Sequence, residues 1–445
     1  MATSRCKHRR PGIRRSIGRP GLATITATAI MFGLAGCLAP TLSESSPRHP
    51  GHGVAWLLRR SLNMNFAVGD SAIETVAVSG KYLVDFLEVP GSGEAYGRIG
   101  PTVTVRDLAS GRTLWTLGSI SGMPAVTART LYIDKSGYDL RTGRQFGIPV
   151  RIPPGSVPDP AGGGLLVIAG PRAHRSLVSL NPRTGSTRWR VPSRSRFWFC
   201  GQIAASRAAV AVMRCGISGR GQYTYVVVKE LDCFDPVTGR LRWKYPLIRG
   251  VLPLSQVLVT VAGRTVVAAE RPDGPWSAMD ARTGATLPGL TRLSNWLRTH
   301  QQHAFLGLGP GRTAVLAESY PDDRALRSLH VIDVTDGRLL WTTPVWHPLD
   351  RVTVGVTHRM LYELNGSELT AYSLRSGAAI GHLSLPVTFA GDAPGLNAEL
   401  VPGRAEDPAE LIAGSQHEAL LANGLLVART RGSGLAAIRI GKLVR

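Results

Sequence analysis

The chain has 445 residues and a formal net charge of +22 at pH 7, with 43% hydrophobic but only 6% aromatic residues. It contains 51 glycines and 30 prolines, and long helical periodicity is scarce, which argues against a mainly helical protein and favours many short strands joined by turns. Arginine dominates the positive charge, but no run resembles a nucleic-acid-binding arm. We therefore expect attraction to anionic surfaces and no nucleic acid partner.

The first 36 residues are predicted to be an export signal and not part of the fold. Seven Lys or Arg residues and no acid accompany an apolar segment, residues 21–36, that is too short to span a membrane comfortably. The segment ends in Leu34-Ala35-Gly36-Cys37, which resembles a bacterial lipobox. The resemblance implies cleavage before Cys37 and a lipid anchor on its thiol. An ordinary secretory signal is the alternative.

Residues 37–53 are polar and contain proline and glycine, so they are predicted to form a flexible tether between the anchor and a domain. Residues 54–59 (VAWLLR) then resemble a lone strand that begins near Trp56. The domain is predicted to cover residues 54–445.

One sequence motif recurs along this domain. An apolar strand ends in Asp, Asn or Ser, a Gly follows four residues later, and in the best copies a Trp stands four residues beyond the Gly. The strong copies are residues 105–115, 178–189, 231–243 and 329–341, and the weaker copies are 138–146, 277–287 and 369–380. The turn glycines are Gly111, Gly143, Gly185, Gly239, Gly284, Gly337 and Gly377. Their spacing of about 44 residues is typical of β-propeller blades.

The chemistry of the motif predicts a hairpin in each copy. The Asp, Asn or Ser side chain can accept hydrogen bonds from the turn's own backbone, and the Gly supplies a residue with positive φ. Because the tryptophans recur at one position, we expect them to pack adjacent blades together and not to stack on a ligand. These docking residues are Trp56, Trp115, Trp189, Trp243 and Trp341.

The two ends of the domain complement each other. Residues 419–428 and 435–443 resemble strands that are not followed by a copy of the motif with its Trp. In contrast, the strand of Trp56 resembles the end of a repeat without its beginning. We expect these strands to share the last blade and close the ring, which removes exposed edges. The prediction is an all-β, eight-bladed β-propeller of four-stranded blades. Seven blades is the alternative.

Three cysteines lie beyond the leader, in an exported and potentially oxidising setting. Cys200 and Cys215 flank a hairpin whose turn is expected near Ser206–Ala208. We expect them to face each other on adjacent strands and to form a disulfide, which leaves Cys233 as a free, buried thiol. Spacing alone does not settle the connectivity.

The Asp-x-x-Thr/Ser-Gly-x-x-x-Trp motifs resemble the repeats of the PQQ-like (quinoprotein) β-propeller superfamily. The resemblance extends from Trp56 to Leu443. This resemblance implies four-stranded blades, often eight, docked by tryptophans. Together with the lipobox, it is similar to the propeller lipoprotein of the Gram-negative outer-membrane assembly machine and to sensor modules of actinobacterial cell-envelope proteins. Quinone-dependent dehydrogenases belong to the same superfamily and imply an adjacent Cys-Cys pair and a calcium site. This chain has neither pattern, so we expect no catalytic residue, cofactor or metal.

The loops between second and third strands should lie opposite the Thr-Gly turns, and they carry an excess of arginine. Arg172, Arg175, Arg324 and Arg327 are the residues expected to contact an acidic protein segment or an anionic envelope polymer. A solvated basic rim is the alternative.

The sequence therefore predicts a lipid-anchored, monomeric, non-enzymatic β-propeller on the outer face of the cytoplasmic membrane. We expect it to be a scaffold or protein-binding module for envelope proteins. One alternative is an extracytoplasmic sensor with a small ligand in the central channel, and a quinone-dependent dehydrogenase is the other. The identity of the partner stays open.

Overall fold

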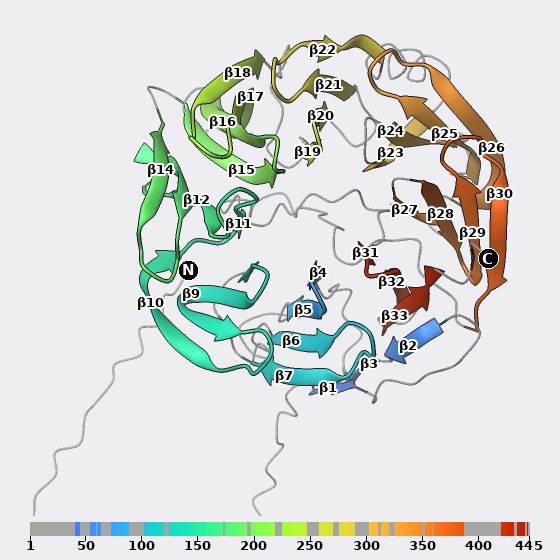
Figure 1. Ribbon diagram of the computed structural model, residues 1–445, viewed down its shortest axis with the longest axis horizontal. Coiled ribbons are helices and arrows are strands. Elements are labelled where there is room, and N and C mark those ends of the chain that lie inside the picture. Colours follow the sequence, from blue (N-terminus) through green and yellow to red (C-terminus); the bar gives the residue numbers. More distant parts are fainter. Residues whose placement is uncertain are drawn as a thin grey trace, which may run out of the picture. The chain divides into compact units, whose positions relative to one another are not determined.

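In the computed structural model every element with described bounds is a β-strand (Figure 1), which confirms the all-β prediction. The chain divides into two compact units, Met1–Leu38 and Ala39–Arg445, and all described strands belong to the second. The structure describes residues 41–44, 54–58, 60–63, 73–88, 102–118, 120, 124–171, 174–193, 197–218, 225–246, 258–269, 276–289, 302–309, 313–319, 325–348, 352–357, 359–386, 420–430, 434–440 and 443.

Six four-stranded antiparallel sheets are each built from four consecutive strands, with hydrogen-bonded neighbours in chain order. They are β4–β7 (Ile73–Ser79, Tyr82–Glu88, Thr102–Asp107, Thr113–Leu117), β11–β14 (Val157–Pro158, Leu165–Ala169, Ser176–Leu180, Thr187–Pro192), β15–β18 (Trp198–Ala205, Val210–Ser218, Tyr225–Phe234, Leu241–Pro246), β19–β22 (Leu258–Ala262, Thr265–Ala269, Trp276–Asp280, Thr286–Leu287), β23–β26 (Gln302–Gly309, Thr313–Ser319, Ala325–Asp333, Leu339–Pro348) and β27–β30 (Val352–Val356, Met360–Asn365, Glu368–Ser373, Ala379–Ser384).

One sheet departs from the expected four strands. It consists of β8 (Ala125–Val126), β9 (Thr130–Asp139) and β10 (Gln145–Ile152). The long strand β9 runs through Lys135 without the loop that would separate a second strand from a third. Asp134 adopts a φ of 50° and lies opposite Ile152 across an irregularity in the β9–β10 register. Because Asp tolerates this left-handed conformation, a local distortion takes the place of a loop and one strand takes the place of two.

The last sheet combines the two ends of the domain. Strand β2 (Val54–Leu58) pairs with β33 (Gly434–Arg439), which continues through β32 (Leu425–Thr430) to β31 (Leu420–Ala422). Trp56 lies opposite Ala437 in this ladder. In addition, β1 (Thr41–Glu44) pairs with β3 (Arg60–Asn63), so part of the segment predicted to be a flexible tether forms a short strand.

The hydrophobic core lies between the sheets. Each of the eight clusters of buried side chains in the described residues joins two successive sheets. One cluster joins Leu435 of β33 to Leu83 of β5, and another joins Leu369 of β29 to Ile438 of β33. Side chains alternate between the two faces of a strand, so a sheet packed on both sides buries both sets.

Candidate functional site

The seven turn glycines occupy turns of one design. Each Gly N–H donates to the backbone carbonyl of the Asp, Asn or Ser four residues earlier, at N···O distances of 2.8–2.9 Å, and all seven have φ between 69° and 77°. In the turn of Asp235, Oδ1 also accepts from the N–H of Val237 at 3.0 Å, from the N–H of Thr238 at 2.9 Å and from its hydroxyl at 3.0 Å. The side chain therefore holds the turn from inside.

These hydrogen bonds act on the ionisation of the turn carboxylates. Burial alone would raise the pKa of Asp235, but hydrogen bonds from Thr238, Val237 and the Arg242 guanidinium outweigh it and lower the pKa to about 2. The same competition lowers the pKa of Asp280, while the Thr142 hydroxyl is the main cause that lowers the pKa of Asp139. Hydrogen bonds donated to a carboxylate favour its charged form.

Four of the five predicted docking tryptophans contact the turn of the following sheet. Each indole Nε1–H donates to the carbonyl of the residue that follows the capping Asp or Ser. The pairs are Trp115 with Leu140 (3.0 Å), Trp189 with Pro236 (3.1 Å), Trp243 with Ala281 (3.2 Å) and Trp341 with Leu374 (2.9 Å). The side chain of Trp56 lies outside the described part. The tryptophans thus serve packing between sheets.

The turn glycines have a second role that the sequence did not reveal. A Cβ at residue 143 would lie 2.8 Å from Cγ of Trp115, and one at residue 239 would lie 2.6 Å from Cδ2 of Trp189. Both distances are shorter than real contacts allow. These two glycines, and likewise Gly284 and Gly377, therefore provide a positive φ for their own turn and space for the indole of the preceding sheet.

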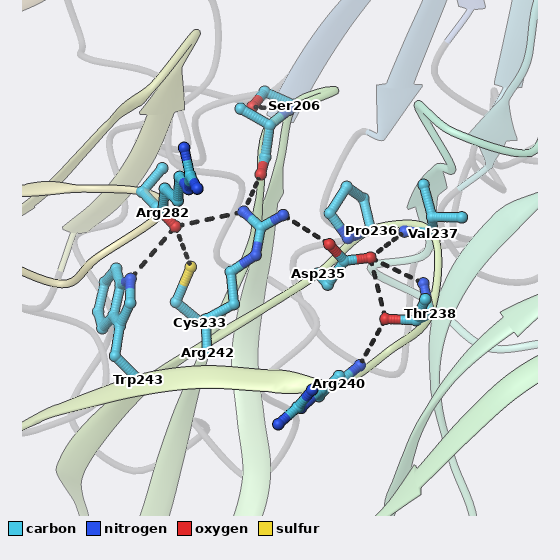
Figure 2. A network of polar contacts seen from close by, with 12 residues as sticks. Ser206, Cys233, Asp235, Pro236, Val237, Thr238, Arg240, Arg242, Trp243 and Arg282 are labelled. Carbon is cyan, nitrogen blue, oxygen red and sulfur yellow. Dashed lines mark hydrogen bonds and ion pairs between the residues drawn. The ribbon is translucent and has the colours of Figure 1, made fainter.

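In two of the tryptophan contacts an arginine also donates to the acceptor carbonyl, and Arg242 is the first example (Figure 2). Arg242 Nη2 donates to Asp235 Oδ2 at 2.6 Å, while Nη1 donates to the carbonyl of Ala208 and, at 3.4 Å, to that of Ala281, the carbonyl that Trp243 also contacts. The Cys233 thiol approaches the same carbonyl at 3.5 Å.

Arg188 repeats the arrangement one sheet earlier. Its Nη2 lies 2.8 Å from Asp159 Oδ2 and 2.7 Å from the Pro236 carbonyl, the acceptor of Trp189. In both sheets the arginine directly precedes the tryptophan in sequence.

A disulfide joins Cys200 to Cys215, with the two Cα atoms 5.8 Å apart. The register differs from the one expected. Cys200 lies opposite Met213 and Cys215 opposite Trp198, and the ladder is irregular between Cys200 and Ile203, so the cysteines are diagonal neighbours. Cys233 is a free, buried thiol, and burial raises its pKa to about 12.

The sequence prediction does not include a buried charge cluster on β16 and β17. Arg214 of β16 forms ion pairs with Asp232 and, at 3.5 Å, with Glu230, both on β17, and its guanidinium lies 4.5 Å from the ring centre of Phe199. Burial raises the pKa of Asp232, and the charge of Arg214 opposes this effect. Charged residues at the inward positions of two otherwise apolar strands were the available signal.

The four arginines predicted to form a binding face are only partly described. Arg175 is half-buried just before β13, and Arg327 lies in β25 with only its backbone described. Arg172, Arg324 and the predicted lipidation residue Cys37 lie outside the described residues. This face and the anchor remain predictions.

Two kinds of feature are absent from the described residues. They contain no group of three His, Cys, Asp or Glu residues placed to hold a metal ion. No helix in the part of the chain that the structure describes is both long and apolar enough to cross a membrane.

Sheets joined by Asp–Gly turns and by tryptophans define a class of all-β repeat proteins. Residues 173–355, which include four of the seven turns, match the PQQ-type family described as outer membrane protein assembly factor BamB. This match, over 183 of the 445 residues, supports a repeat of the PQQ-like β-propeller kind. No curated protein matches the chain.

The chain is similar to several solved structures at low identity and low TM-score. BamB from Moraxella catarrhalis is 12% identical, with 83% of this chain and 98% of that chain covered and a TM-score of 0.42. The quinohemoprotein alcohol dehydrogenase ADHIIG from Pseudomonas putida HK5 is 12% identical, with coverages of 88% and 77% and a TM-score of 0.46. The β-propeller domain of the Trilobed protease from Pyrococcus furiosus is 9% identical, with coverages of 69% and 96% and a TM-score of 0.38.

Proposed function

We propose that residues 54–445 form an eight-bladed β-propeller whose last blade is completed by β2. The eight sheets of three or four strands support this blade number. The pairing of β2 with β33, and the buried clusters on both sides of that sheet, support ring closure. A seven-bladed ring would leave one of these sheets without a place.

The propeller acts as a non-enzymatic scaffold that binds other proteins of the cell envelope. The observation that carries this proposal is the match of residues 173–355 to the family of an outer-membrane assembly factor. The residues of the repeated motif support this proposal, because their polar side chains stabilise turns and contacts between sheets and do not form a catalytic site. Lipidation of Cys37 would hold the scaffold on the outer face of the cytoplasmic membrane.

Proximity labelling in intact cells tests the role and the anchor together. Wild type is expected to label envelope-assembly proteins, and Cys37→Ser is expected to lose that labelling while the protein is still made. A variant with Arg172, Arg175, Arg324 and Arg327 changed to Ser keeps the anchor and tests the predicted binding face.

Two results would contradict the scaffold proposal. One is a partner set of the wild type that contains no protein of the cell envelope. The other is a quinone chromophore or a small ligand that co-purifies with wild type in stoichiometric amount, because such a finding would favour an enzyme or a sensor.

A further inference from the structure

The hairpin turns at one end of the sheets form a surface that we call the turn face. It comprises the turns between first and second strands and the turns between third and fourth strands, which share one end of an antiparallel sheet. Backbone hydrogen bonds join the two kinds of turn. Leu108 N–H donates to the Lys81 carbonyl at 2.8 Å, and Leu374 N–H donates to the Arg359 carbonyl at 2.8 Å.

The turn face continues from one sheet to the next. Asn423 Nδ2 donates to the Gly80 carbonyl at 2.7 Å, and Ser79 Oγ donates to the Thr127 carbonyl at 2.8 Å. Ser206 Oγ donates to the Gly263 carbonyl at 3.0 Å. Since the docking tryptophans also contact neighbouring turns, turns that are far apart in sequence belong to one surface.

Exposed cationic side chains recur on the turn face. Among the described residues thirteen are exposed, and they come from seven of the eight sheets. They are Lys81, Arg112, Arg129, Arg141, Arg144, Arg183, Arg207, Arg240, Arg264, Arg282, Arg338, Arg359 and Arg375. Of these thirteen, Arg264 lies within ion-pair distance of a described carboxylate, 3.6 Å from Asp280.

The carboxylates of the same turns are occupied differently. Asp139, Asp235 and Asp280 each direct Oδ1 at the backbone N–H groups of their own turn. Hydrogen bonds within the turns therefore occupy one oxygen of each of these three carboxylates. Asp336 is an exposed carboxylate in another of the turns, but the thirteen exposed cations outnumber it, which leaves the outer layer of the face positive.

Four of the arginines occupy the same place, two residues after the residue that caps the turn. We call Arg141, Arg183, Arg282 and Arg375 the turn arginines. The cap fixes the backbone of three of them, because Asp139, Asn181 and Asp280 accept a hydrogen bond from the arginine N–H at 3.0–3.1 Å. A rigid backbone lowers the entropy lost when a side chain binds a ligand.

We propose that the turn face binds a linear anionic polymer that carries phosphate groups. A guanidinium presents a planar fork that matches a phosphate with two hydrogen bonds. Cations that recur over seven sheets fit charges that recur along a polymer better than they fit one short acidic motif. The scaffold role and the Cys37 anchor are not needed for this inference.

Other anionic partners fit the turn face less well. Val237, with 60% of its surface exposed, is the one large exposed apolar side chain in the described Asp–Gly turns, whereas attachment to a lipid surface usually needs several apolar or aromatic anchors. Two of the thirteen cations lie over aromatic rings, Lys81 over Tyr82 and Arg183 over Phe146, but Tyr82 is buried and Phe146 is half-buried. Single-stranded nucleic acid is generally held by stacking on accessible aromatic rings. A polymer without bases is therefore favoured.

The test measures binding of long-chain inorganic polyphosphate to the full-length protein by calorimetry at several salt concentrations. Changing the four turn arginines to Ser is expected to weaken binding about 30-fold or more and to reduce the slope of log affinity against log salt by about 3. The matched control changes Lys135, Arg151, Arg190 and Lys244 to Ser, removing the same charge away from the turns, and should weaken binding about 3-fold at most. Equal losses in both variants would overturn the proposal.

Further arms identify the ligand chemistry. Changing the four turn arginines to Lys keeps the charge but removes the fork, and is expected to weaken binding about 5- to 10-fold. Unchanged affinity would show that only net charge is read. Tighter binding to DNA, or binding to vesicles with anionic lipid but not to polyphosphate, would assign the surface to another partner. Circular dichroism and the thermal midpoint show whether each variant is folded.

Discussion

At the scale of single residues, the turn glycine has two separable duties, and the chain supplies a control for each. Gly239 has a φ of 70° and faces the Trp189 ring, whereas Gly263 has a φ of 56° with open space where a Cβ would lie. Gly263→Ala should cost about 1 kcal/mol of unfolding free energy from the backbone conformation alone. Gly239→Ala should cost about 3 kcal/mol, because the indole must also move. Urea unfolding measures both, and equal costs would contradict the second duty.

The turn carboxylates also give the protein a pH dependence. The pKa of Asp235 is about 2 in the folded protein and 3.8 as the reference value, so its contribution is complete above pH 4 and is lost as the pH falls toward 2. The contribution is of the order of 2 kcal/mol at most. Unfolding free energies between pH 2 and 5 should fall less steeply for Asp235→Asn than for wild type. Asp336→Asn, in another turn, is the control, and an identical slope for Asp235→Asn and wild type would refute the prediction.

At the scale of elements, the contact between the β15–β18 and β19–β22 sheets includes one guanidinium, which links Asp235 and the Ala208 carbonyl of its own sheet with the Ala281 carbonyl of the next. Arg242→Met removes these bonds while keeping an apolar stem, and should cost about 2–3 kcal/mol because the acceptors are left partly buried. Arg240→Met changes an exposed neighbour and should cost less than about 0.5 kcal/mol. Amide hydrogen exchange in β19–β22 should accelerate in the first variant only. Equal exchange in both variants would refute the role of Arg242.

Sequence reasoning succeeded where the determining interactions are local. An Asp, a Thr and a Gly within five residues define a turn through their own backbone, so the turn positions could be read directly. The acceptor of the Trp243 indole lies 38 residues away, and the Arg214 cluster depends on three strands, so neither could be assigned in advance. The sequence prediction omits the turn arginines for a different reason. It treats these turns only as backbone features, and it considers charge only in the opposite loops.

At the scale of the whole molecule, the pairing of β2 with β33 predicts that the two ends of the domain can be joined covalently. Leu57 lies opposite Ala436, so Leu57→Cys with Ala436→Cys should form a disulfide and raise the thermal midpoint, because the bond restricts a very long loop in the unfolded chain. Leu57→Cys with Ala428→Cys is the control, since Ala428 lies on β32, one strand further away. Cross-linking of both pairs, or of neither, would contradict the described register.

The docking tryptophans also decide what the protein's fluorescence reports. Each of the four described indoles belongs to one sheet but lies against the turn of the following one. Its emission therefore depends on the polarity and order of the following repeat as well as of its own. A spectral change caused by a ligand or a substitution can thus originate one repeat further along the chain than the tryptophan that produces it.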